Sequence, residues 1–515
     1  MNRALYLLGI DIGSSSVKAV IVDIESGSCV ASAFSPETEM RISAPKPGWA
    51  EQHPLDWESH AKSAIGKALQ KAGLGSSGIG AIGITYQMHG LICLDKNGIV
   101  LRPSIIWCDS RAVETGNKAF DELGREFCFR HYLNSPGNFT ASKLRWVKEN
   151  EPEIFEKTKT ILLPGDWLAF RLTGEKCTTR SGLSEGILWD YERREPAVDL
   201  LNYYGIPAGM IPPVCETFGI QGRLTKEAAA SFNLEEGIPV SYRSGDQPNN
   251  AFSLRALNPG DIAATAGTSG VVYCVTGKPA YDKQSRVNTF VHVNDSAQSP
   301  RNGVLLCING TGISNSWIRN TLAGIHSGTM QDNSIWQENA RMLSYTEINA
   351  ASAKIPAGSD GLMFIPFGNG AERMLNNAGI HASFENIDFT RHSQNHLFRA
   401  VQEGIAFAFR YGLDIMAGMG FKPAIIRAGH GNMFLSPVFT QTLANLTSVT
   451  IELYNTNGAI GAALGAGMGA GIYSSADEAF GNLKCIQRIS PDSYQEMITN
   501  NYHQWEKLIH RQLQK

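Results

Sequence analysis

Residues 9–23, GIDIGSSSVKAVIVD, place an acid and a turn of small hydroxyl residues between two strand-like runs. The backbone N–H groups of such a turn form a concave anion site, so we expect a phosphate there. The residues expected to bind it are Gly13, Ser14, Ser15 and Lys18. Asp11 would repel a phosphate unless Mg²⁺ lay between the two. The alternative is a surface hairpin in which Asp11 caps a backbone amide and Lys18 is simply solvated.

A second turn of this kind lies about 255 residues later, in 261–278, DIAATAGTSGVVYCVTGK. Its small residues are Gly267, Thr268, Ser269 and Gly270. Two such hairpins indicate two similarly built halves with a boundary near residue 255. The alternative is that a common type of turn occurs twice by chance. Two phosphate-type turns facing one cleft would hold the two ends of a polyphosphate. Neither turn is a P-loop, because the chain has no G-x-x-x-x-G-K-[ST].

Asp246 lies in 244–251, SGDQPNNA, where the pattern changes from a strand to a helix. An acid at the carboxyl end of a strand in an α/β fold points into the crevice where ligands bind. Its alternative role is to cap the amino terminus of the following helix. The two roles are compatible, and position alone does not decide between them.

A polar and aromatic set follows two further apolar runs, in 86–90, YQMHG, and 107–111, WCDSR. Four side chains could bind several sugar hydroxyls: Gln87, His89, Asp109 and Arg111. Two could cover an apolar sugar face: Met88 and Trp107. The structural alternatives are that His89 is a core histidine, that Met88 and Trp107 serve only packing, and that Asp109 and Arg111 form a mutual ion pair. The set as a whole favours sugar binding.

These residues need a scaffold, and 515 residues are enough for two large domains of α/β class. Strand-like runs prevail up to about residue 35 and again over 79–101, and a helical pattern covers 55–73. Residues 110–235 read as mostly helical. The Gly/Ala-rich run 458–473 suits a tightly packed helix, and a basic helical tail follows it.

Composition narrows the class of partner. A net charge of −3 and a pI near 6.5 give no reason to expect nucleic acid or an anionic membrane. The nine cysteines are scattered with no C-x-x-C pair, which excludes an obvious zinc site and predicts reduced thiols in the cytoplasm. No apolar run reaches the roughly 18 residues of a membrane span. We therefore expect small-molecule partners.

At this point the motifs resemble those of the FGGY carbohydrate kinases, within the sugar kinase, Hsp70 and actin superfamily. The resemblance covers nearly the whole chain in the right order, through GIDIGSSSVK, YQMHGLICLD, WCDSRA, FTASKLRWVKENEP, LLPGDWLAFRLTGE, SGDQPNNA, ATAGTSGVV, GLMFIPFGNGAER and GAIGAALGAGMGAG. It implies two ribonuclease-H-like lobes, 1–255 with the sugar and the catalytic aspartates and 256–515 with the nucleotide, and ATP with Mg²⁺ in the cleft. The QMHG element favours xylulose over glycerol, ribulose or rhamnulose.

The resemblance also implies roles for single residues. Asp246 would be the general base, Asp11 would assist with Mg²⁺, and Met88, His89 and Gln247 would contact the sugar. The turn at Gly267, Thr268 and Ser269 would meet the phosphates. On the nucleotide side it implies Gly312, Trp317, Gly429, Gly431 and Asn432, the last three in a segment, AGHGNMFLSP, that departs from the family pattern.

The expected reaction is ATP-dependent phosphorylation of the terminal hydroxyl of a ketopentose, with D-xylulose as the first candidate. The alternatives are a kinase for another ketose or a sugar acid and, in a different class, a non-catalytic binding protein that responds to ATP or sugar. A homodimer is compatible with the sequence.

Overall fold

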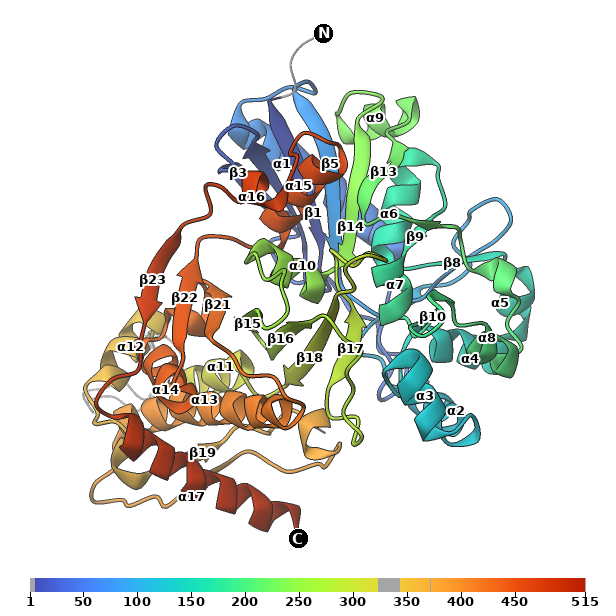
Figure 1. Ribbon diagram of the computed structural model, residues 1–515. Helices are drawn as coiled ribbons and strands as arrows, with labels where there is room; N and C mark the ends of the chain where they lie inside the picture. The colour runs from blue at the N-terminus through green and yellow to red at the C-terminus, as the bar shows by residue number, and fades with distance from the viewer. Residues whose placement is uncertain (1–4, 323–342, 371, 515) are drawn as a thin grey trace, which may run out of the picture.

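The computed structural model describes residues 5–322, 343–370 and 372–514, and it shows two lobes, each built on one large twisted sheet (Figure 1). The sheet of the first lobe has six strands in the order β13-β14-β5-β1-β2-β3. Their bounds are β1 (Tyr6–Ile12), β2 (Val17–Asp23), β3 (Cys29–Ser35), β5 (Ile79–Tyr86), β13 (Phe218–Arg223) and β14 (Pro239–Gly245). The predicted first hairpin and the strand before Asp246 are therefore confirmed.

The sheet of the second lobe has seven strands in the order β17-β18-β16-β15-β21-β22-β23. Their bounds are β15 (Ile262–Ala266), β16 (Gly270–Thr276), β17 (Asn288–Val291), β18 (Asn302–Ile308), β21 (Ile425–Gly429), β22 (Thr450–Tyr454) and β23 (Cys485–Ile489). The second predicted hairpin is β15 and β16, which pair antiparallel around the turn at 267–269.

The two sheets repeat one topology, which confirms the two similarly built halves. In each sheet an antiparallel hairpin, β1 with β2 or β15 with β16, lies beside two parallel strands, β5 and β14 or β21 and β22. A parallel neighbour requires a crossover, and helices supply it. Helix α1 (Pro54–Ala72) precedes β5, and helix α13 (Gln394–Gly418) precedes β21.

Helix α1 illustrates how the sequence sets an element. Its buried residues recur every three or four positions, so one face packs on the first sheet. These buried residues include Trp57, Ala61, Ala64, Ile65, Ala68 and Leu69. The helix starts with Pro54 behind the His53 cap, and Gly73 at φ +66° ends it in the left-handed region that favours glycine. The predicted helix over 55–73 is thus confirmed.

Residues 110–235 form a helical region beside the first sheet, on the right of Figure 1, as the sequence predicts. Its helices are α2 (Val113–Glu122), α3 (Arg125–Tyr132), α4 (Thr140–Asn150), α5 (Pro152–Lys157), α6 (Pro164–Thr173), α7 (Arg180–Glu185), α8 (Val198–Tyr204) and α9 (Lys226–Phe232). Short strand pairs lie outside the two large sheets, among them β4 (Glu51–Gln52) with β7 (Ser104–Ile105), β6 (Ile92–Leu94) with β8 (Thr160–Leu162), β9 (Thr178–Thr179) with β12 (Val214–Cys215), and β10 (Trp189–Asp190) with β11 (Glu195–Pro196).

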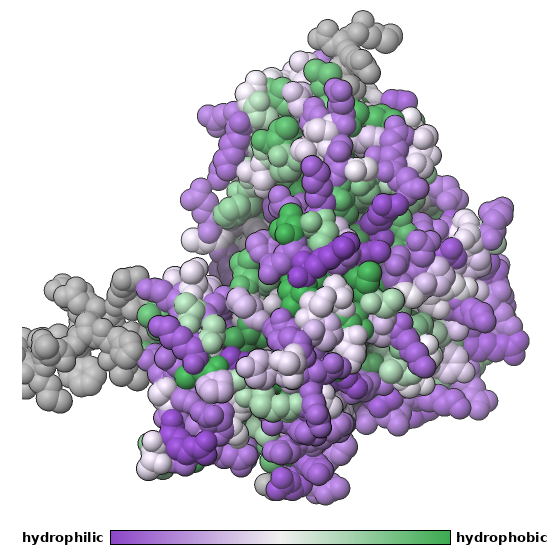
Figure 2. Space-filling view, turned by 60° about the vertical axis from the view of Figure 1, so that its left-hand side comes forward, coloured by the Kyte–Doolittle hydropathy of each residue, from purple (hydrophilic) through white to green (hydrophobic). Residues whose placement is uncertain are grey.

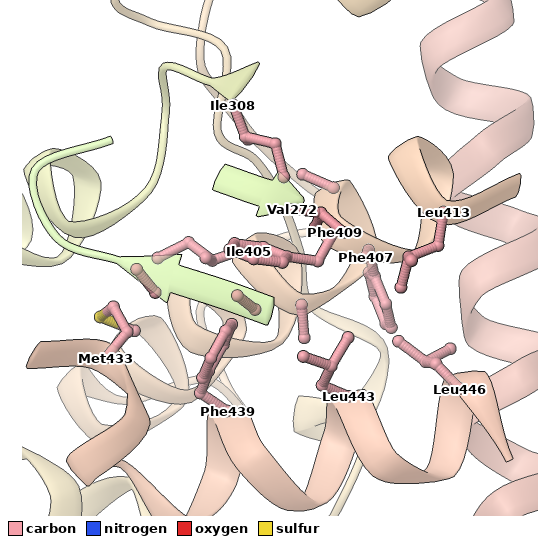
Figure 3. Close-up of a cluster of buried hydrophobic side chains, with 14 of the residues drawn as sticks. Val272, Ile308, Ile405, Phe407, Phe409, Leu413, Met433, Phe439, Leu443 and Leu446 are labelled. Atoms are coloured by element: carbon pink, nitrogen blue, oxygen red, sulfur yellow. The ribbon is translucent and has the colours of Figure 1, made fainter. Parts of the chain in front are cut away.

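The core of the second lobe lies between its sheet and the helices α13 and α14 (Pro437–Thr447) (Figure 3). Phe409 and Phe439 contact edge to face with ring centroids 5.4 Å apart. The tail helix α17 (Gln495–Leu513) is the predicted C-terminal helix. It buries Trp505, whose indole N–H donates to the carbonyl of Phe364 at 2.8 Å, so the tail is part of this lobe.

Hydrophilic residues cover most of the face in Figure 2, with small apolar patches between them, and the outline is indented between the upper and lower parts of the molecule. Within the described ranges, no helix combines the length and apolar character that crossing a membrane requires. The second lobe also contains α11 (Gly312–Leu322) and α12 (Tyr345–Ala353), whereas α16 (Ala476–Ala479) packs on the first lobe, in one cluster with Leu7 and Val20.

Helix α15 (Gly458–Gly469) lies beyond the expected boundary at residue 255, yet it packs on the sheet of the first lobe. Its approach depends on glycines in the strands beneath it. A Cβ atom at Gly9 would lie 1.9 Å from the carbonyl oxygen of Ala459, and one at Gly83 would lie 1.9 Å from that of Ala462. The sequence pattern predicts the tight packing of this helix but not its partner, because the contact joins residues far apart in the chain.

We predict that Gly83→Ala destabilises the protein, because the added methyl group would push the backbone of α15 away from β5. The expected loss is about 1–3 kcal/mol in the free energy of unfolding. Gly66→Ala, in α1, is the matched control, since a Cβ there meets no atom within 4 Å. That variant should gain about 0.5–1 kcal/mol. Urea unfolding measures both, and equal stabilities of the two variants would contradict the assigned packing.

Candidate active site

Asp246 is the first residue of helix α10 (Asp246–Ser253), directly after strand β14. The helix N-cap is Gly245, so the structure does not give Asp246 the N-capping role. The carboxylate is partly buried and faces the backbone and side chain of Gln247. This places an acid at the carboxyl edge of the first sheet, as the sequence predicts.

Asp11 lies on the neighbouring part of the same edge, next to the last residue of β1. Its backbone pairs with Lys18 on β2 and with Thr85 on β5. A Cβ at Gly458, the first residue of α15, would lie 3.2 Å from Asp11 Oδ2. The carboxylate therefore lies at the amino terminus of a helix, whose dipole favours a negative charge.

The two carboxylates share one electrostatic environment. Burial raises the pKa of Asp11 to about 6, which Lys18 opposes. Burial and then the charge of Asp11 raise the pKa of Asp246 to about 7. A carboxyl group with a pKa near neutrality is suited to accept a proton at neutral pH. The sequence predicted both acids, but not that the charge of Asp11 raises the pKa of Asp246.

The pair also fits a magnesium ion. Mg²⁺ is usually held by one or two carboxylates together with substrate phosphates. Among the described residues no cluster of three or more His, Cys, Asp or Glu side chains could hold a metal without such a substrate. Asp11, at the end of β1, is the residue we expect to hold the ion, and this assignment remains a prediction.

The first turn lies beside Gln52 and Trp107 and lines neither of the two cavities described below. Ser14 Oγ accepts a hydrogen bond from the indole N–H of Trp107 at 3.4 Å, and its carbonyl accepts one from Gln52 at 2.7 Å. Ser15 accepts from the backbone of Met40 at 2.7 Å. A phosphate contact by Gly13, Ser14, Ser15 and Lys18 therefore stays a prediction, and Trp107, 46% exposed, presents free surface beside this turn.

Gln87 and Met88 are buried, Gln87 next to the end of β1 and Met88 against Gly245. The Gln87 backbone N–H donates to the carbonyl of Ile12 at 2.7 Å, and its side-chain amide donates to Gln52 at 3.1 Å, while Oε1 is buried without a partner. Met88 is buried against Gly245, where a Cβ would lie 2.6 Å from Met88 Cγ. Met88 thus contacts the residue that precedes Asp246.

His89 has a left-handed backbone, with φ +62°, which is strained for a residue other than glycine and is typical of functional sites. Its Nδ1 lies 2.8 Å from the carbonyl oxygen of Glu185, so Nδ1 carries the proton and Nε2 remains an acceptor. The ring packs against Phe139 and Phe290. Burial, with the charge of Lys143, lowers the pKa of His89 to about 3, so the ring is neutral.

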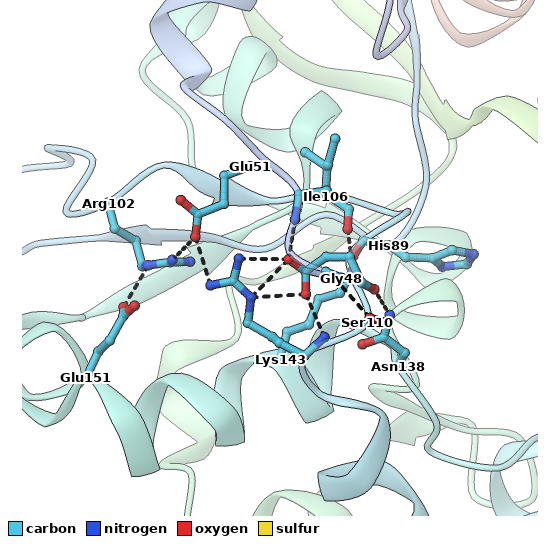
Figure 4. Close-up of polar contacts among 12 residues, drawn as sticks. Gly48, Glu51, His89, Arg102, Ile106, Ser110, Asn138, Lys143 and Glu151 are labelled. Atoms are coloured by element: carbon cyan, nitrogen blue, oxygen red, sulfur yellow. Dashed lines mark hydrogen bonds and ion pairs between the residues drawn. The ribbon is translucent and has the colours of Figure 1, made fainter. Parts of the chain in front are cut away.

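Lys143 holds the backbone of this segment. Its ammonium group donates to the carbonyl of His89 at 2.8 Å and to that of Ile106 at 2.9 Å, which ties YQMHG to the segment before Trp107 (Figure 4). The side chain is fully buried, and burial lowers its pKa to about 7. Lys143 belongs to the FTASKLRW motif, and it acts on His89 through the backbone.

Asp109 and Arg111 correct the sugar contacts expected from sequence. The Arg111 guanidinium donates to both Asp109 oxygens at 2.7–3.0 Å, and the two side chains are 1% and 0% exposed. Arg111 also pairs with Glu51 at 2.8 Å, in a chain of ion pairs that continues through Arg102 to Glu151 (Figure 4). The mutual ion pair leaves neither side chain open to a sugar, and the network fixes the WCDSR segment instead.

Glu185 is the residue that sequence reasoning missed. It ends α7 and is fully buried, with both carboxylate oxygens lacking a hydrogen-bond partner. A Cβ at Gly245 would lie 2.3 Å from Glu185 Oε2. Burial, and then the charges of Asp246 and Asp166, raise its pKa well above the ordinary value. The surrounding sequence, SGLSEG, gives no sign that Glu185 lies beside Gly245, because this contact depends on long-range packing.

Two adjoining cavities lie at the second turn. One has a volume of about 500 Å³ and is lined by Gly267, Thr268 and Ser269, by Gly429, Gly431 and Asn432, and by Gln247 and Asn250 of the first lobe. The other has about 460 Å³ and is lined by Gly312, Asn432 and Glu39 among others. Residues of both lobes therefore line one crevice, and Gln247 connects it to Asp246.

The amino terminus of α11 packs directly on the second turn. The backbone N–H groups of Gly312 and Ile313 donate to the carbonyls of Gly267 and Thr268 at 2.9 and 3.1 Å. A Cβ at Gly312 would lie 2.3 Å from the Gly267 oxygen, so this position requires glycine. Trp317 is 51% exposed and lines neither cavity, so its expected nucleotide contact has no support from the crevice.

With this geometry in place, two family models match the chain. The N-terminal domain of the FGGY family of carbohydrate kinases matches residues 6–253, and the C-terminal domain of that family matches residues 262–470. The chain belongs to the FGGY family of carbohydrate kinases. The chain is therefore a sugar kinase, and the predicted α/β fold with two lobes is confirmed.

Individual members of the FGGY family resemble the chain over most of its length. A xylulose kinase of Bacillus subtilis is 29% identical over 92% of this chain and 90% of its own. A glycerol kinase of Thermococcus gammatolerans is also 29% identical, over 98% of this chain and 97% of its own. The crystal structure of a xylulose kinase from Rhodospirillum rubrum superposes with a TM-score of 0.84 at 26% identity, covering 99% of this chain and 100% of that one.

The raised pKa of Asp246 predicts that this FGGY site destabilises the fold as pH rises. Ionising the carboxyl costs more in the folded chain than in the unfolded chain, so the penalty develops between about pH 4 and 7 and is complete above that range. Asp246→Asn should therefore raise Tm clearly more at pH 8 than at pH 5. Asp56→Asn, on the exposed start of α1, is the control and should show no such difference. Equal gains at both pH values would contradict the assignment.

Proposed function

We propose that this FGGY kinase transfers the γ-phosphoryl group of ATP to the terminal hydroxyl of a ketopentose, D-xylulose, to form D-xylulose 5-phosphate. One observation about the neighbours of Asp246 carries the proposal. Gly245, directly before it, packs against Met88, and Gln247, directly after it, lines the cavity at the turn 267–269. A base in that position can serve a hydroxyl aimed at a phosphate. The similarity to xylulose kinases and the QMHG element support the choice of sugar.

In the proposed mechanism, the sugar hydroxyl attacks the γ-phosphorus in line while the bond to the ADP oxygen breaks. The hydroxyl proton passes late to Asp246, which is a competent base at neutral pH because its pKa is raised to about 7. No covalent intermediate is required, because phosphoryl transfer depends on positioning and charge neutralisation. Mg²⁺ held by Asp11 would neutralise phosphate charge when bound.

Sugar recognition would fall to the segments on the first-lobe side. His89 Nε2 would accept a hydrogen bond from a sugar hydroxyl, because Nδ1 is engaged with Glu185. The exposed indole of Trp107 offers an apolar face that a sugar ring or chain can cover. Lys143 and the Asp109–Arg111 pair would act as positioning groups, since they are buried and bound to the backbone around these residues.

The phosphates of ATP would lie at the turn formed by Gly267, Thr268 and Ser269. Small residues with backbone amides and hydroxyls suit an anion, and Gly429, Gly431 and Asn432 line the same cavity. All nine cysteines of the chain are free, which supports a reducing compartment, and we propose the cytoplasm.

We predict that Asp246→Asn lowers kcat for D-xylulose by about 10²–10⁴-fold with little change in KM, because the amide cannot accept the proton. A coupled assay of ADP release measures both constants. Asp56→Asn, remote from the crevice, should keep wild-type kinetics. Unimpaired turnover in the Asp246 variant would refute the role of general base.

A substrate panel separates the proposed sugar from its alternatives. D-xylulose should give the highest kcat/KM among D-xylulose, D-ribulose, glycerol and D-gluconate in the same assay. Glycerol belongs in the panel because a glycerol kinase is as similar in sequence as the xylulose kinases are. A higher value for another compound would reassign the substrate within the family. ATP binding without turnover of any compound would favour the non-catalytic binding protein.

A further inference from the structure

Two cysteines that play no part in phosphoryl transfer meet at the edge of the first lobe. Cys215 ends β12, which pairs in parallel with β9, and its partner in the register is Thr179. Cys177 lies two residues before Thr179, so its side chain is on the same face of the pair. The two Sγ atoms are 3.1 Å apart, and both residues are half-buried.

An arginine lies against both sulfur atoms. Arg243 Nη2 is 3.3 Å from Cys177 Sγ and 3.6 Å from Cys215 Sγ, and it also donates to the carbonyl of Cys177 at 2.9 Å. Asp166 pairs with Arg243 Nε at 2.9 Å and holds the guanidinium in place. A guanidinium beside a thiol stabilises the thiolate. The thiol of Cys215, donating to Cys177, and Arg243 together lower the pKa of Cys177, and the same hydrogen bond raises the pKa of Cys215.

We propose that Cys177 and Cys215 form a peroxide-reactive dithiol that closes to an intramolecular disulfide in the folded protein. A disulfide bond is about 2.05 Å long, so the sulfur atoms need to approach by only about 1 Å from their separation of 3.1 Å. Rotation of the two side chains can supply such a shift. The strands β9 and β12 restrict it little, because both are short and lie outside the large sheets.

The chemistry uses one equivalent of hydrogen peroxide. The Cys177 thiolate attacks a peroxide oxygen, so an S–O bond forms, the O–O bond breaks and hydroxide leaves, taking up a proton to become water. Cys215 then loses its proton as its sulfur attacks the sulfur of Cys177. The S–S bond forms, and the S–O bond breaks with release of a second water. Two electrons pass from the two sulfurs to the peroxide.

The other cysteines provide the internal comparison. Among the described residues, the Cys177–Cys215 pair is the one in which a thiol contacts another sulfur. Cys29 and Cys108 are the exposed cysteines. The Cys29 thiol contacts no other sulfur within the described ranges and donates instead to the carbonyl oxygen of Ala31. Exposure alone would therefore favour oxidation of Cys29, whereas the proposed pair favours Cys177.

The test treats the reduced full-length protein with increasing hydrogen peroxide, alkylates the remaining thiols and locates the modifications by mass spectrometry. We expect a peptide pair joined through Cys177 and Cys215, formed about tenfold faster than any oxidation of Cys29. Dithiothreitol should restore both thiols. Circular dichroism on the same samples establishes that the chain is folded.

Three variants separate the proposed pair from general oxidation. Cys215→Ser should leave Cys177 as a sulfenic acid that dimedone traps, and Cys177→Ser should leave Cys215 reduced. Cys29→Ser, the matched control, should form the disulfide at the wild-type rate. The proposal is overturned if Cys177 reacts no faster than Cys29, if it pairs with another cysteine, or if the disulfide forms only in urea.

Discussion

The burial of two carboxylates that repel each other, Asp11 and Asp246, is the constraint on which the rest of the site depends. Both acids lie at one edge of the first sheet, and each is harder to ionise than a free carboxyl group. An arrangement of this kind is unfavourable for the fold and useful for a reaction that needs a base near neutral pH. A cation and phosphates between the lobes would relieve the repulsion when the substrates bind.

Two features of the scaffold hold the acids where this repulsion arises. Glycines in β1 and β5 let α15 approach the sheet, which brings Gly458 against the carboxylate of Asp11. A buried charge fixes the segments around His89 and Ile106, since Lys143 donates to the carbonyls of both residues. Neither feature contacts a substrate in our account. Both determine where the groups that do so can lie.

Local patterns in the sequence were sufficient for much of this structure. The two hairpins, the change from strand to helix at Asp246 and the helix predicted over 55–73 all follow from residues close together in the chain, and the structure confirms them. Their repetition also predicted the shared topology of the two sheets. The position of Asp246 was predictable because the carboxyl edge of a parallel strand is where α/β proteins bind ligands.

Long-range contacts explain what the sequence did not predict. The contacts of α15 with β1 and β5 join segments more than 370 residues apart, and Glu185 is packed against Gly245, which is distant in sequence. Asp109 and Arg111 looked available for a sugar because Glu51, which completes their network, is distant in sequence. Trp317 was expected at the nucleotide, yet it is exposed and lines neither cavity.

The central claim, that Asp246 is a base poised near neutral pH, is tested most directly by titrating its carboxyl group. Infrared difference spectra between the wild type and Asp246→Asn, recorded from pH 4 to 9, isolate the protonated carboxyl band. The account predicts that this band disappears with an apparent pKa near 7. A carboxyl group that is already fully ionised at pH 5 would contradict it.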